Sequence, residues 1–273
     1  MLQAIISMAV VGAVFGGLLG FAAQKFAVPV DPKVEQIKRA LPGANCGACG
    51  FVGCSELADA IATGKVAHTA CTVGGSTAAR DIAKILGLEE ETEEKEQPVA
   101  HVYCTGGRAE CGNRYEYDGI PDCRAASMLQ GVGFRECAYG CLGLGTCVRA
   151  CPFGAIYLDK NSLAVVDERK CTGCGRCVAV CPKNIIQMAP RSRKVHVLCS
   201  NTEKGVVVRK ICKVGCIACK ACAKACQYDA IHVEDNLARI DYEKCTNCGE
   251  CAKKCPTKCI LDFQVDEEGR EAS

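Results

Sequence analysis

The chemistry of this chain must come from its cysteines, which number 26 among 273 residues. A content this high indicates a disulfide scaffold, a zinc protein or an iron–sulfur protein. Disulfide scaffolds are usually short and secreted. This chain is long, and it spaces cysteines as closely as the run Cys171, Cys174, Cys177 and Cys181. Neighbours this close cannot all reach disulfide partners, so we interpret the cysteines as reduced metal ligands facing a reducing compartment.

Two runs, CTGCGRCVAVCP and CTNCGECAKKCP, have the spacing C-x2-C-x2-C-x3-C-P. This spacing is typical of bacterial ferredoxins, in which three cysteines bind one [4Fe–4S] cluster and the fourth crosses over to the second cluster of the pair. A single C-x2-C pair would also suit zinc. Linked runs that end in proline favour iron–sulfur clusters instead.

The runs belong to an internal repeat, which predicts two copies of one module in tandem. Ala155-Ile156 matches Ala230-Ile231, and Asp167 matches Asp241. The cysteines repeat with them: Cys137, Cys141, Cys147 and Cys151 recur as Cys212, Cys216, Cys222 and Cys226, and Cys171, Cys174, Cys177 and Cys181 recur as Cys245, Cys248, Cys251 and Cys255.

The crossing rule predicts the ligands of four clusters, two in each module. Three sets follow directly: Cys137, Cys141 and Cys147 with Cys181; Cys171, Cys174 and Cys177 with Cys151; Cys245, Cys248 and Cys251 with Cys226. The last set takes Cys255 and three of Cys212, Cys216, Cys219 and Cys222. Ordinary ferredoxin spacing selects Cys219, whereas the repeat selects Cys212, because Leu144 stands where Cys219 would be. We prefer the ordinary spacing and keep both alternatives open.

A separate group near the N-terminus has the spacing C-x2-C-x4-C-x16-C, formed by Cys46, Cys49, Cys54 and Cys71. Four thiolates complete one cluster, so this group predicts a fifth [4Fe–4S] centre. The alternative is a closed zinc site with the same four ligands.

The five predicted clusters use 20 of the 26 cysteines and leave six over. Cys259 aligns with Ile185 and is interpreted as a packing residue. Cys104, Cys111, Cys123 and Cys199 have no place in the runs, and a sixth cluster on these four is the alternative. We prefer to interpret them as buried thiols, because free cysteine packs as a small hydrophobic residue.

The first 23 residues carry no charge and are long enough to cross a bilayer as a helix. A signal peptide would begin with a basic region, which is missing here, so we expect a retained anchor. Lys25, Lys33, Lys38 and Arg39 follow the span. By the positive-inside rule they predict a single-pass protein of the cell (inner) membrane with its cluster domains in the cytoplasm. The net charge of +2 gives no indication of nucleic-acid binding.

The predicted fold class is α+β. It combines an N-terminal transmembrane helix, a small helical [4Fe–4S] domain and two tandem bacterial-type 2[4Fe–4S] ferredoxin-like modules. The acidic run EEETEEKEQ has no apolar periodicity and predicts a linker. The predicted divisions are anchor 1–26, four-cysteine domain 27–88, acidic linker 89–100, cysteine-containing connecting segment 101–136, first module 137–190, connector 191–211, second module 212–264 and tail 265–273.

Motifs for nucleotide chemistry are missing from the sequence: it has no G-x-G-x-x-G after a strand and no G-x-x-x-x-G-K-[ST] loop. The four histidines, His68, His101, His196 and His232, are scattered and are interpreted as surface or core residues. We therefore predict no catalytic residue and no complete active site in this chain, which could not transfer a hydride alone.

The order of parts resembles the B subunit of the Rnf complex. The most specific feature is LPGANCGACGFVGC with the later Cys71, placed between a membrane anchor and ferredoxin repeats. The resemblance implies a membrane complex that oxidises reduced ferredoxin, reduces NAD and pumps Na⁺ or H⁺, with soluble ferredoxin and other membrane and flavin-bearing subunits as partners. Two modules in place of one indicate the longer form within this family. The N-terminal cysteine group also resembles a domain of corrinoid iron–sulfur proteins, which lack this anchor and these repeats.

Two functions are therefore compared. The first is an electron-transfer subunit of the ion-translocating complex, which accepts electrons from reduced ferredoxin. The alternative is a membrane-tethered polyferredoxin that serves another oxidoreductase without ion pumping. The anchor and the segment from Pro42 to Cys71 favour the first, and a zinc-binding structural protein is a third hypothesis that metal identity would separate from both.

Overall fold

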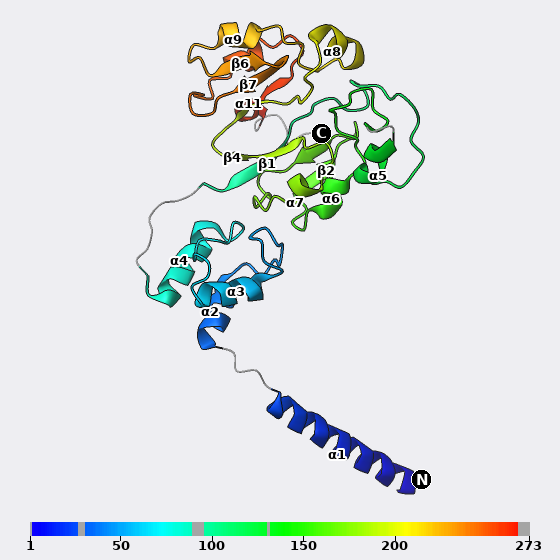
Figure 1. Cartoon of the computed structure of the whole chain (residues 1–273), viewed down its shortest axis with the longest axis vertical. Coiled ribbons are helices and arrows are strands. Elements are labelled where there is room, and N and C mark those ends of the chain that lie inside the picture. The colour runs from blue at the N-terminus through cyan, green and yellow to red at the C-terminus, as the bar shows by residue number, and fades with distance from the viewer. Residues whose placement is uncertain (1, 27–30, 89–95, 130–131, 267–273) are drawn as a thin grey trace.

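The structure is a computed structural model, and it describes residues 2–26, 31–88, 96–129 and 132–266. Figure 1 shows the chain passing from an N-terminal helix through a small helical domain into two modules that contain strands. The first helix, α1 (Leu2–Lys25), has 24 residues. Its Ile6–Lys25 part has a mean hydropathy of 2.1 and contains no buried residue, and it is long and apolar enough to cross a membrane.

The small helical domain packs three helices around one apolar core: α2 (Pro32–Ala40), α3 (Cys54–Ala62) and α4 (Gly75–Leu86). Asp31 caps α2 by accepting a hydrogen bond from Lys33 N at 2.8 Å, and Pro32 occupies the first helical position. Each helix contributes a large side chain with no exposed surface, namely Ile37, Leu57 and Ile82. This core holds α3, which begins at Cys54, against the loop that carries the other early cysteines.

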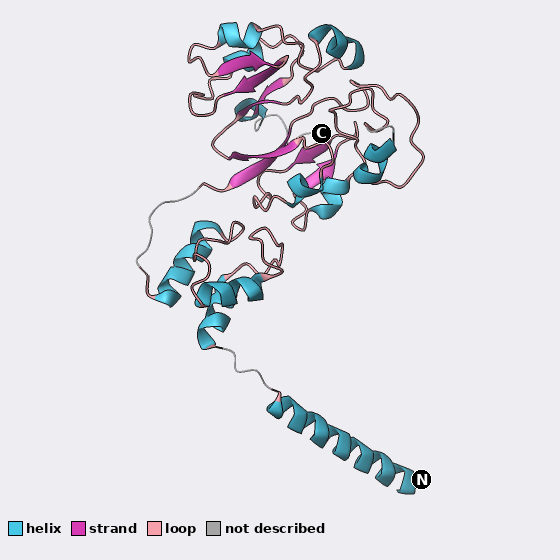
Figure 2. Ribbon diagram, viewed as in Figure 1, coloured by secondary structure: helices cyan, strands magenta, loops and turns pink. Residues whose placement is uncertain are grey.

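Each module consists of two small antiparallel sheets of two strands (Figure 2). In the first module β1 (Pro98–Val102) pairs with β4 (Ile186–Pro190), and β2 (Ile156–Leu158) pairs with β3 (Ala164–Val166). In the second, β5 (Val195–Val197) pairs with β8 (Ile260–Asp262), and β6 (Ile231–Glu234) pairs with β7 (Leu237–Ile240). The short helices are α5 (Cys123–Met128), α6 (Thr146–Ala150), α7 (Arg176–Val180), α8 (Gly205–Ile211), α9 (Ala221–Ala225), α10 (Glu250–Lys253) and α11 (Phe263–Asp266).

Two strands lie where the sequence predicted connecting chain. β1 begins inside the predicted linker 89–100, and β5 lies inside the predicted connector 191–211. Each pairs with the last sheet strand of its module, β4 or β8, and so covers the edge of that strand. The modules therefore extend further toward the N-terminus than the cysteine runs indicate.

The two modules meet at a pair of buried histidines, His101 on β1 and His196 on β5. Their ring centroids lie 4.0 Å apart, and neither side chain is more than 4% exposed. His196 shares a hydrogen bond of 2.6 Å with the hydroxyl of Tyr242, whereas His101 Nε2 has no partner among the described residues. This contact joins the first strand of one module to the first strand of the other.

We expect acidification to destabilise this contact between the modules. Burial lowers the pKa of His101 to about 3, with smaller contributions from the charges of His196 and Lys194. An unfolded histidine titrates near 6.5, so the folded state binds fewer protons and loses stability as pH falls from 6.5 toward 3. At pH 5 the loss is about 2 kcal/mol.

The measurement is the midpoint temperature of cluster bleaching at pH 7.5 and at pH 5.0. His101→Leu should have a smaller difference between the two midpoints than the unchanged chain, because Leu carries no titratable group. An equal difference in both proteins would contradict the role given to His101.

Candidate iron–sulfur centres

The first centre lies in the small helical domain, where Cys46, Cys49, Cys54 and Cys71 line one hollow. Asn45 Oδ1 accepts from Cys54 N at 2.8 Å and fixes the start of α3. Gly74 N donates to Cys71 Sγ at 3.3 Å, as backbone amides do toward the sulfurs of iron–sulfur centres. The four thiols and this amide donor fit the ligand requirement of one [4Fe–4S] cluster.

The loops of the two modules share one backbone conformation, which determines how their cysteines align. In each loop the residues before and after the middle position have positive φ. These pairs are Gly143 and Gly145, Gly173 and Gly175, Ala218 and Lys220, and Asn247 and Gly249. The middle positions are therefore Leu144, Cys174, Cys219 and Cys248. It follows that each loop begins at Cys141, Cys171, Cys216 or Cys245, and that Cys137 and Cys212 lie outside the loops.

The centre nearest the small domain brings together Cys171, Cys174, Cys177 and Cys151, the set predicted from the sequence. Burial raises the pKa of Cys177 to about 12, together with the nearby thiols of Cys171, Cys174 and Cys151. Ala155 N donates to Cys151 Sγ at 3.4 Å. The crossover cysteine Cys151 therefore lies beside the other loop, and the Ala155 amide donates a hydrogen bond to its sulfur.

Its counterpart in the second module brings together Cys226, Cys245, Cys248 and Cys251, again the predicted set. They line one hollow whose apolar wall includes Ile231 and Ile240. Ala230 N donates to Cys226 Sγ at 3.4 Å, which repeats the contact at Cys151. Cys226 is followed by Gln227 instead of proline, yet the crossover geometry is the same.

The other centre of the second module has Cys216, Cys219, Cys222 and Cys255 around one hollow. Burial raises the pKa of Cys222 to about 11, and the nearby thiols of Cys216, Cys219 and Cys255 add to this. The hollow does not include Cys212 in its lining, so the geometry agrees with the ordinary ferredoxin spacing. Cys259 also lines this hollow, and its Sγ lies 3.6 Å from Cys255 Sγ.

The corresponding centre of the first module differs from the predicted set. Burial raises the pKa of Cys147 to about 12, and the neighbouring thiols that add to this are Cys141, Cys123, Cys181 and, fourth, Cys177 of the adjacent centre. Cys123 therefore joins Cys141, Cys147 and Cys181. The predicted ligand Cys137 lines a different hollow, together with Cys104, Cys111, Cys199 and Cys212.

A polar network attaches α5, which begins at Cys123, to the loop that begins α6. Cys123 N donates to the Thr146 hydroxyl at 2.7 Å, and that hydroxyl donates to Asp122 at 3.1 Å. Arg149 adds an ion pair with Asp122 at 3.5 Å. These contacts place Cys123 beside Cys147, and Leu144 packs with Cys123 against the core around Phe134 and Leu142. Sequence spacing missed Cys123 because it enters from a segment outside the loop.

Burial of so many thiols has a direct chemical consequence. Desolvation penalises a thiolate, and it raises the pKa values of Cys147, Cys177 and Cys251 to about 12. Free thiols with these pKa values stay protonated at neutral pH. Metal binding requires the thiolate, so loading of these centres releases protons and stabilises the fold.

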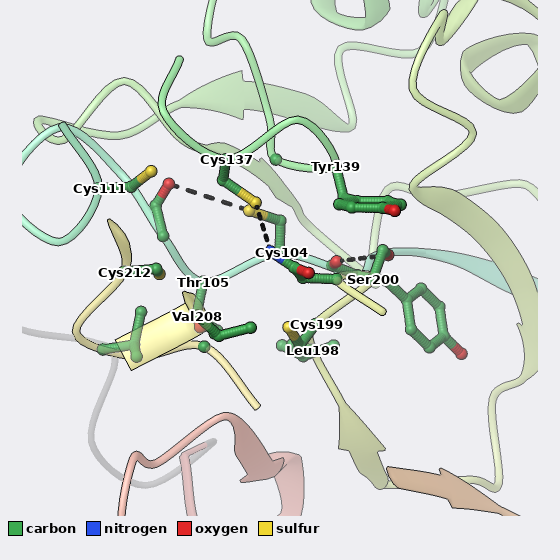
Figure 3. A pocket seen from close by; sticks show the side chains of 16 residues that line it. Cys104, Thr105, Cys111, Cys137, Tyr139, Leu198, Cys199, Ser200, Val208 and Cys212 are labelled. Atoms are coloured by element: carbon green, nitrogen blue, oxygen red, sulfur yellow. Dashed lines mark hydrogen bonds between the residues drawn. The ribbon is translucent and has the colours of Figure 1, made fainter. Parts of the chain in front are cut away.

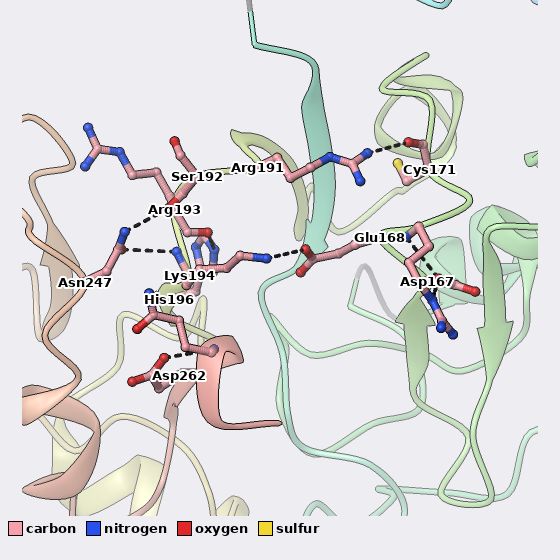
Figure 4. A network of polar contacts seen from close by, with 12 residues as sticks. Asp167, Glu168, Cys171, Arg191, Ser192, Arg193, Lys194, His196, Asn247 and Asp262 are labelled. Atoms are coloured by element: carbon pink, nitrogen blue, oxygen red, sulfur yellow. Dashed lines mark hydrogen bonds and ion pairs between the residues drawn. The ribbon is translucent and has the colours of Figure 1, made fainter. Parts of the chain in front are cut away.

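The segment between the modules, residues 191–194, contacts a cysteine loop of each one (Figure 4). Arg191 donates to the carbonyl of Cys171 at 3.1 Å, and Arg193 donates to the carbonyl of Cys245 at 2.9 Å. Lys194 forms an ion pair with Glu168 at 3.3 Å. Two positive charges therefore lie beside two different centres, one in each module.

We expect Arg193→Gln to lower the reduction potential of the centre at Cys245 by tens of millivolts, where about 59 mV is a tenfold change for one electron. A nearby positive charge stabilises the reduced, more negative cluster, and glutamine removes that charge. Redox titration followed by electron paramagnetic resonance measures the shift.

Arg191→Gln is the matched control, because it should lower the potential of the centre at Cys171 and leave the other unchanged. Equal shifts of both centres in both variants would contradict this assignment.

Comparison with protein families agrees with the order of these centres. A family described as "Putative Fe-S cluster" matches residues 41–73, which contain the N-terminal centre. Two families, each described as a 4Fe-4S dicluster domain, match residues 138–188 and 215–259. The predicted fold class, with one small iron–sulfur domain followed by two dicluster modules, is confirmed.

Curated relatives match almost the whole chain. The B subunit of an ion-translocating oxidoreductase complex of Methanosarcina acetivorans is 44% identical over 95% of this chain and 97% of the relative. The B subunit of the Na(+)-translocating ferredoxin:NAD(+) oxidoreductase complex of Acetobacterium woodii is 48% identical over 93% of this chain and 75% of the relative. The B subunit of the proton-translocating ferredoxin:NAD(+) oxidoreductase complex of Clostridium ljungdahlii is 42% identical over 94% of this chain and 90% of the relative.

Proposed function

Because this chain belongs to the family formed by the B subunits of ion-translocating oxidoreductase complexes, we propose that it transfers electrons within such a complex, from reduced ferredoxin toward NAD. The observation that carries this proposal is the series of four-thiol centres, each with the ligands that one [4Fe–4S] cluster requires. When bound, such a cluster supplies one-electron redox chemistry and no hydride chemistry. NAD reduction is therefore assigned to another, flavin-bearing subunit.

Five clusters are assigned to this function. Their ligands are Cys46, Cys49, Cys54 and Cys71; Cys151, Cys171, Cys174 and Cys177; Cys123, Cys141, Cys147 and Cys181; Cys216, Cys219, Cys222 and Cys255; and Cys226, Cys245, Cys248 and Cys251. Cys123 replaces Cys137 in the third set, because its thiol neighbours Cys147 and because Leu144 occupies the middle position of that loop.

Contacts between centres support a route from the small domain into the first module. Cys46 of the small domain lies close enough to Cys174 of the first module to contribute, after the larger effect of burial, to the raised pKa of Cys174. Cys147 has Cys177 of the adjacent centre in the same role. Stepwise transfer of single electrons needs centres that neighbour one another in this way.

The apolar helix α1 supports a membrane association, and we propose that it is a single-pass anchor. Lys25, Lys33, Lys38 and Arg39 follow it, which favours the cytoplasmic side for the cluster domains. Soluble ferredoxin reaches the centres from that side, and the membrane subunits of the complex receive electrons near the anchor.

The test uses membranes that contain the whole complex, with and without this chain. Reduced ferredoxin should drive NAD reduction only when the chain is present. The purified full-length chain should be bleached by reduced ferredoxin in the absence of other subunits. A chain that contains zinc and no acid-labile sulfide would exclude electron transfer.

A further inference from the structure

Five cysteines line a hollow between the two modules, and the five clusters proposed above use none of them. They are Cys104, Cys111, Cys137, Cys199 and Cys212. Figure 3 shows them gathered around this hollow from segments that lie far apart in the sequence. Cys111, Cys137 and Cys212 also form one buried cluster in which each is at most 9% exposed.

Backbone pairing holds the two sides of the hollow together. Cys111 and Cys212 face each other in an isolated antiparallel bridge, and Lys213 N donates to Glu110 O at 3.0 Å. The side chains of Cys111 and Cys212 pack in the same buried cluster. A segment of the first module is thus fixed against α8 and the chain that leads into the second module.

Polar donors already point at sulfurs of this hollow. Asn201, which is 2% exposed, donates through Nδ2 to Cys137 Sγ at 3.4 Å. Cys141 N donates to Cys104 Sγ at 3.4 Å. Amide donors to sulfur are a feature of iron–sulfur sites, because they stabilise the charge that thiolate and cluster carry.

A buried positive charge beside the hollow is the independent observation. Arg135 is 2% exposed, and its guanidinium donates to Cys111 O at 3.0 Å. Its Nε has no hydrogen-bond acceptor, and no carboxylate forms an ion pair with it, among the residues that the structure describes. A buried charge is costly unless an opposite charge compensates it. Four thiolates with a [4Fe–4S] core carry the net negative charge that would compensate Arg135.

We propose that Cys104, Cys111, Cys137 and Cys212 bind a sixth [4Fe–4S] cluster at the junction of the two modules. This inference rests on the proposed electron-transfer function and extends it, because it names the link between the two halves of the route. It differs from the sixth site considered from the sequence, which grouped Cys104 and Cys111 with Cys123 and Cys199.

Cys104 is chosen over Cys199 as the fourth ligand because of its neighbours. Cys104 Sγ contacts Gly106 O at 3.9 Å, and Gly106 lies against Cys212 and Cys111, which are both proposed ligands. Cys199 Sγ accepts from Cys216 N at 3.3 Å just as Cys104 Sγ accepts from Cys141 N, so the contact of Cys104 with Gly106 is what separates the two.

The position of the site explains what it adds. On one side Cys104 Sγ contacts the backbone of Cys141, a proposed ligand of the first module. On the other side Cys199 connects the hollow to Cys216, a proposed ligand of the second module. One electron arrives from the first centre and one leaves to the second, with no bond made or broken. Without this site the two modules have no described cysteine centre between them.

The test measures iron and acid-labile sulfide in the full-length chain, purified without oxygen. The unchanged chain should contain about 24 iron with equal sulfide, from six clusters of four. Cys111→Ser and Cys212→Ser should each contain about 20. Cys199→Ser, which changes a cysteine of the same hollow, should keep about 24.

Other outcomes would overturn the proposal. About 20 iron in the unchanged chain, with no change in Cys111→Ser, would show that the hollow holds only thiols. Loss of four iron from Cys199→Ser and none from Cys104→Ser would overturn the ligand choice. One zinc lost with Cys111→Ser, and no sulfide, would replace the cluster with a zinc site.

One further measurement completes the design. Circular dichroism of each variant separates loss of one cluster from loss of the fold, because a folded variant keeps the spectrum of the unchanged chain. Absence of sulfide from the unchanged chain would instead reject the proposed function itself. If only the sixth site is absent, the chain still contains five clusters. That outcome is therefore distinguishable from failure of the proposed electron-transfer function.

Discussion

Cys123→Ser is expected to remove one cluster, about four iron per chain, although Cys123 lies 18 residues before the nearest cysteine loop. The reason is the middle position of that loop, which Leu144 occupies. The loop therefore offers two of its own thiols, Cys141 and Cys147, and Cys181 crosses over as a third. A [4Fe–4S] cluster needs one thiolate for each iron, so we propose Cys123 as the fourth ligand.

The decisive control returns a cysteine to the middle position. In Cys123→Ser/Leu144→Cys the loop has the same spacing as Cys171, Cys174 and Cys177, and its backbone already has the same pattern of positive φ at Gly143 and Gly145. We expect the double variant to regain the lost iron and sulfide. Leu144→Cys alone should keep the iron content of the unchanged chain.

An opposite result would locate the fourth ligand elsewhere. If Cys123→Ser keeps all its iron and Cys137→Ser loses four from this centre, then the spacing of the internal repeat describes the ligands and Cys123 is a packing residue. Electron paramagnetic resonance identifies the centre that is lost, because the other cluster signals persist.

Much of the architecture could be predicted from the sequence because ligand spacing within a loop is local. The C-x2-C-x2-C runs dictate a loop that wraps one cluster, and Asp31-Pro32 begins a helix for reasons of capping alone. The crossover cysteines Cys151 and Cys226 follow their loops at a fixed distance, so the structure brings them to the opposite loop as expected.

The proposed ligand Cys123 could not be predicted from spacing, because its position depends on contacts between distant segments. Cys123 reaches its centre through the hydrogen bonds of Asp122 and Thr146, and no spacing rule connects residues 123 and 147. The glycines on both sides of Leu144 could have indicated that Leu144 is the middle position of this loop, because glycine readily adopts the positive φ of the loop backbone. In the second loop of this kind Ala218 and Lys220 adopt the same conformation without glycine, which conceals the pattern.

The strands β1 and β5 were missed for a similar reason. Val195–Val197 is three residues long, and its partner Ile260–Asp262 lies more than sixty residues later. A strand of that length has almost no pattern of its own, and pairing with a distant partner decides its conformation. The histidines of these two strands form the contact between modules, so the interface was missed together with the strands.

Gly143→Ala is expected to destabilise the first module by about 3 kcal/mol or more, combining the cost of a left-handed alanine with that of overpacking. Gly143 has φ +71, and an added Cβ would lie 2.2 Å from the backbone oxygen of Ser162. Ser162 cannot move away easily, because Asp159 holds the hairpin turn through hydrogen bonds to Asn161 N and Leu163 N.

Gly145→Ala is the matched control, because Gly145 has φ +73 in the same loop and an added Cβ would meet nothing closer than 3.5 Å. It should cost only about 1 kcal/mol, which is the strain of the left-handed conformation. The equivalent of Gly143 in the second module is Ala218 at φ +54, so a left-handed alanine alone is compatible with such a loop. The steric contact with Ser162 is what separates the two variants.

The midpoint of cluster bleaching in guanidinium measures both effects, and iron content shows whether the centre assembles at all. Gly143→Ala should lose the centre at Cys141 or bleach at clearly lower denaturant, while Gly145→Ala should bleach close to the unchanged chain. Equal midpoints would mean that the hairpin turn yields to the added methyl group. The hairpin turn at Ser162 would then adjust to the cluster loop. Packing against Ser162 would not determine the positions of Cys141 and Cys147.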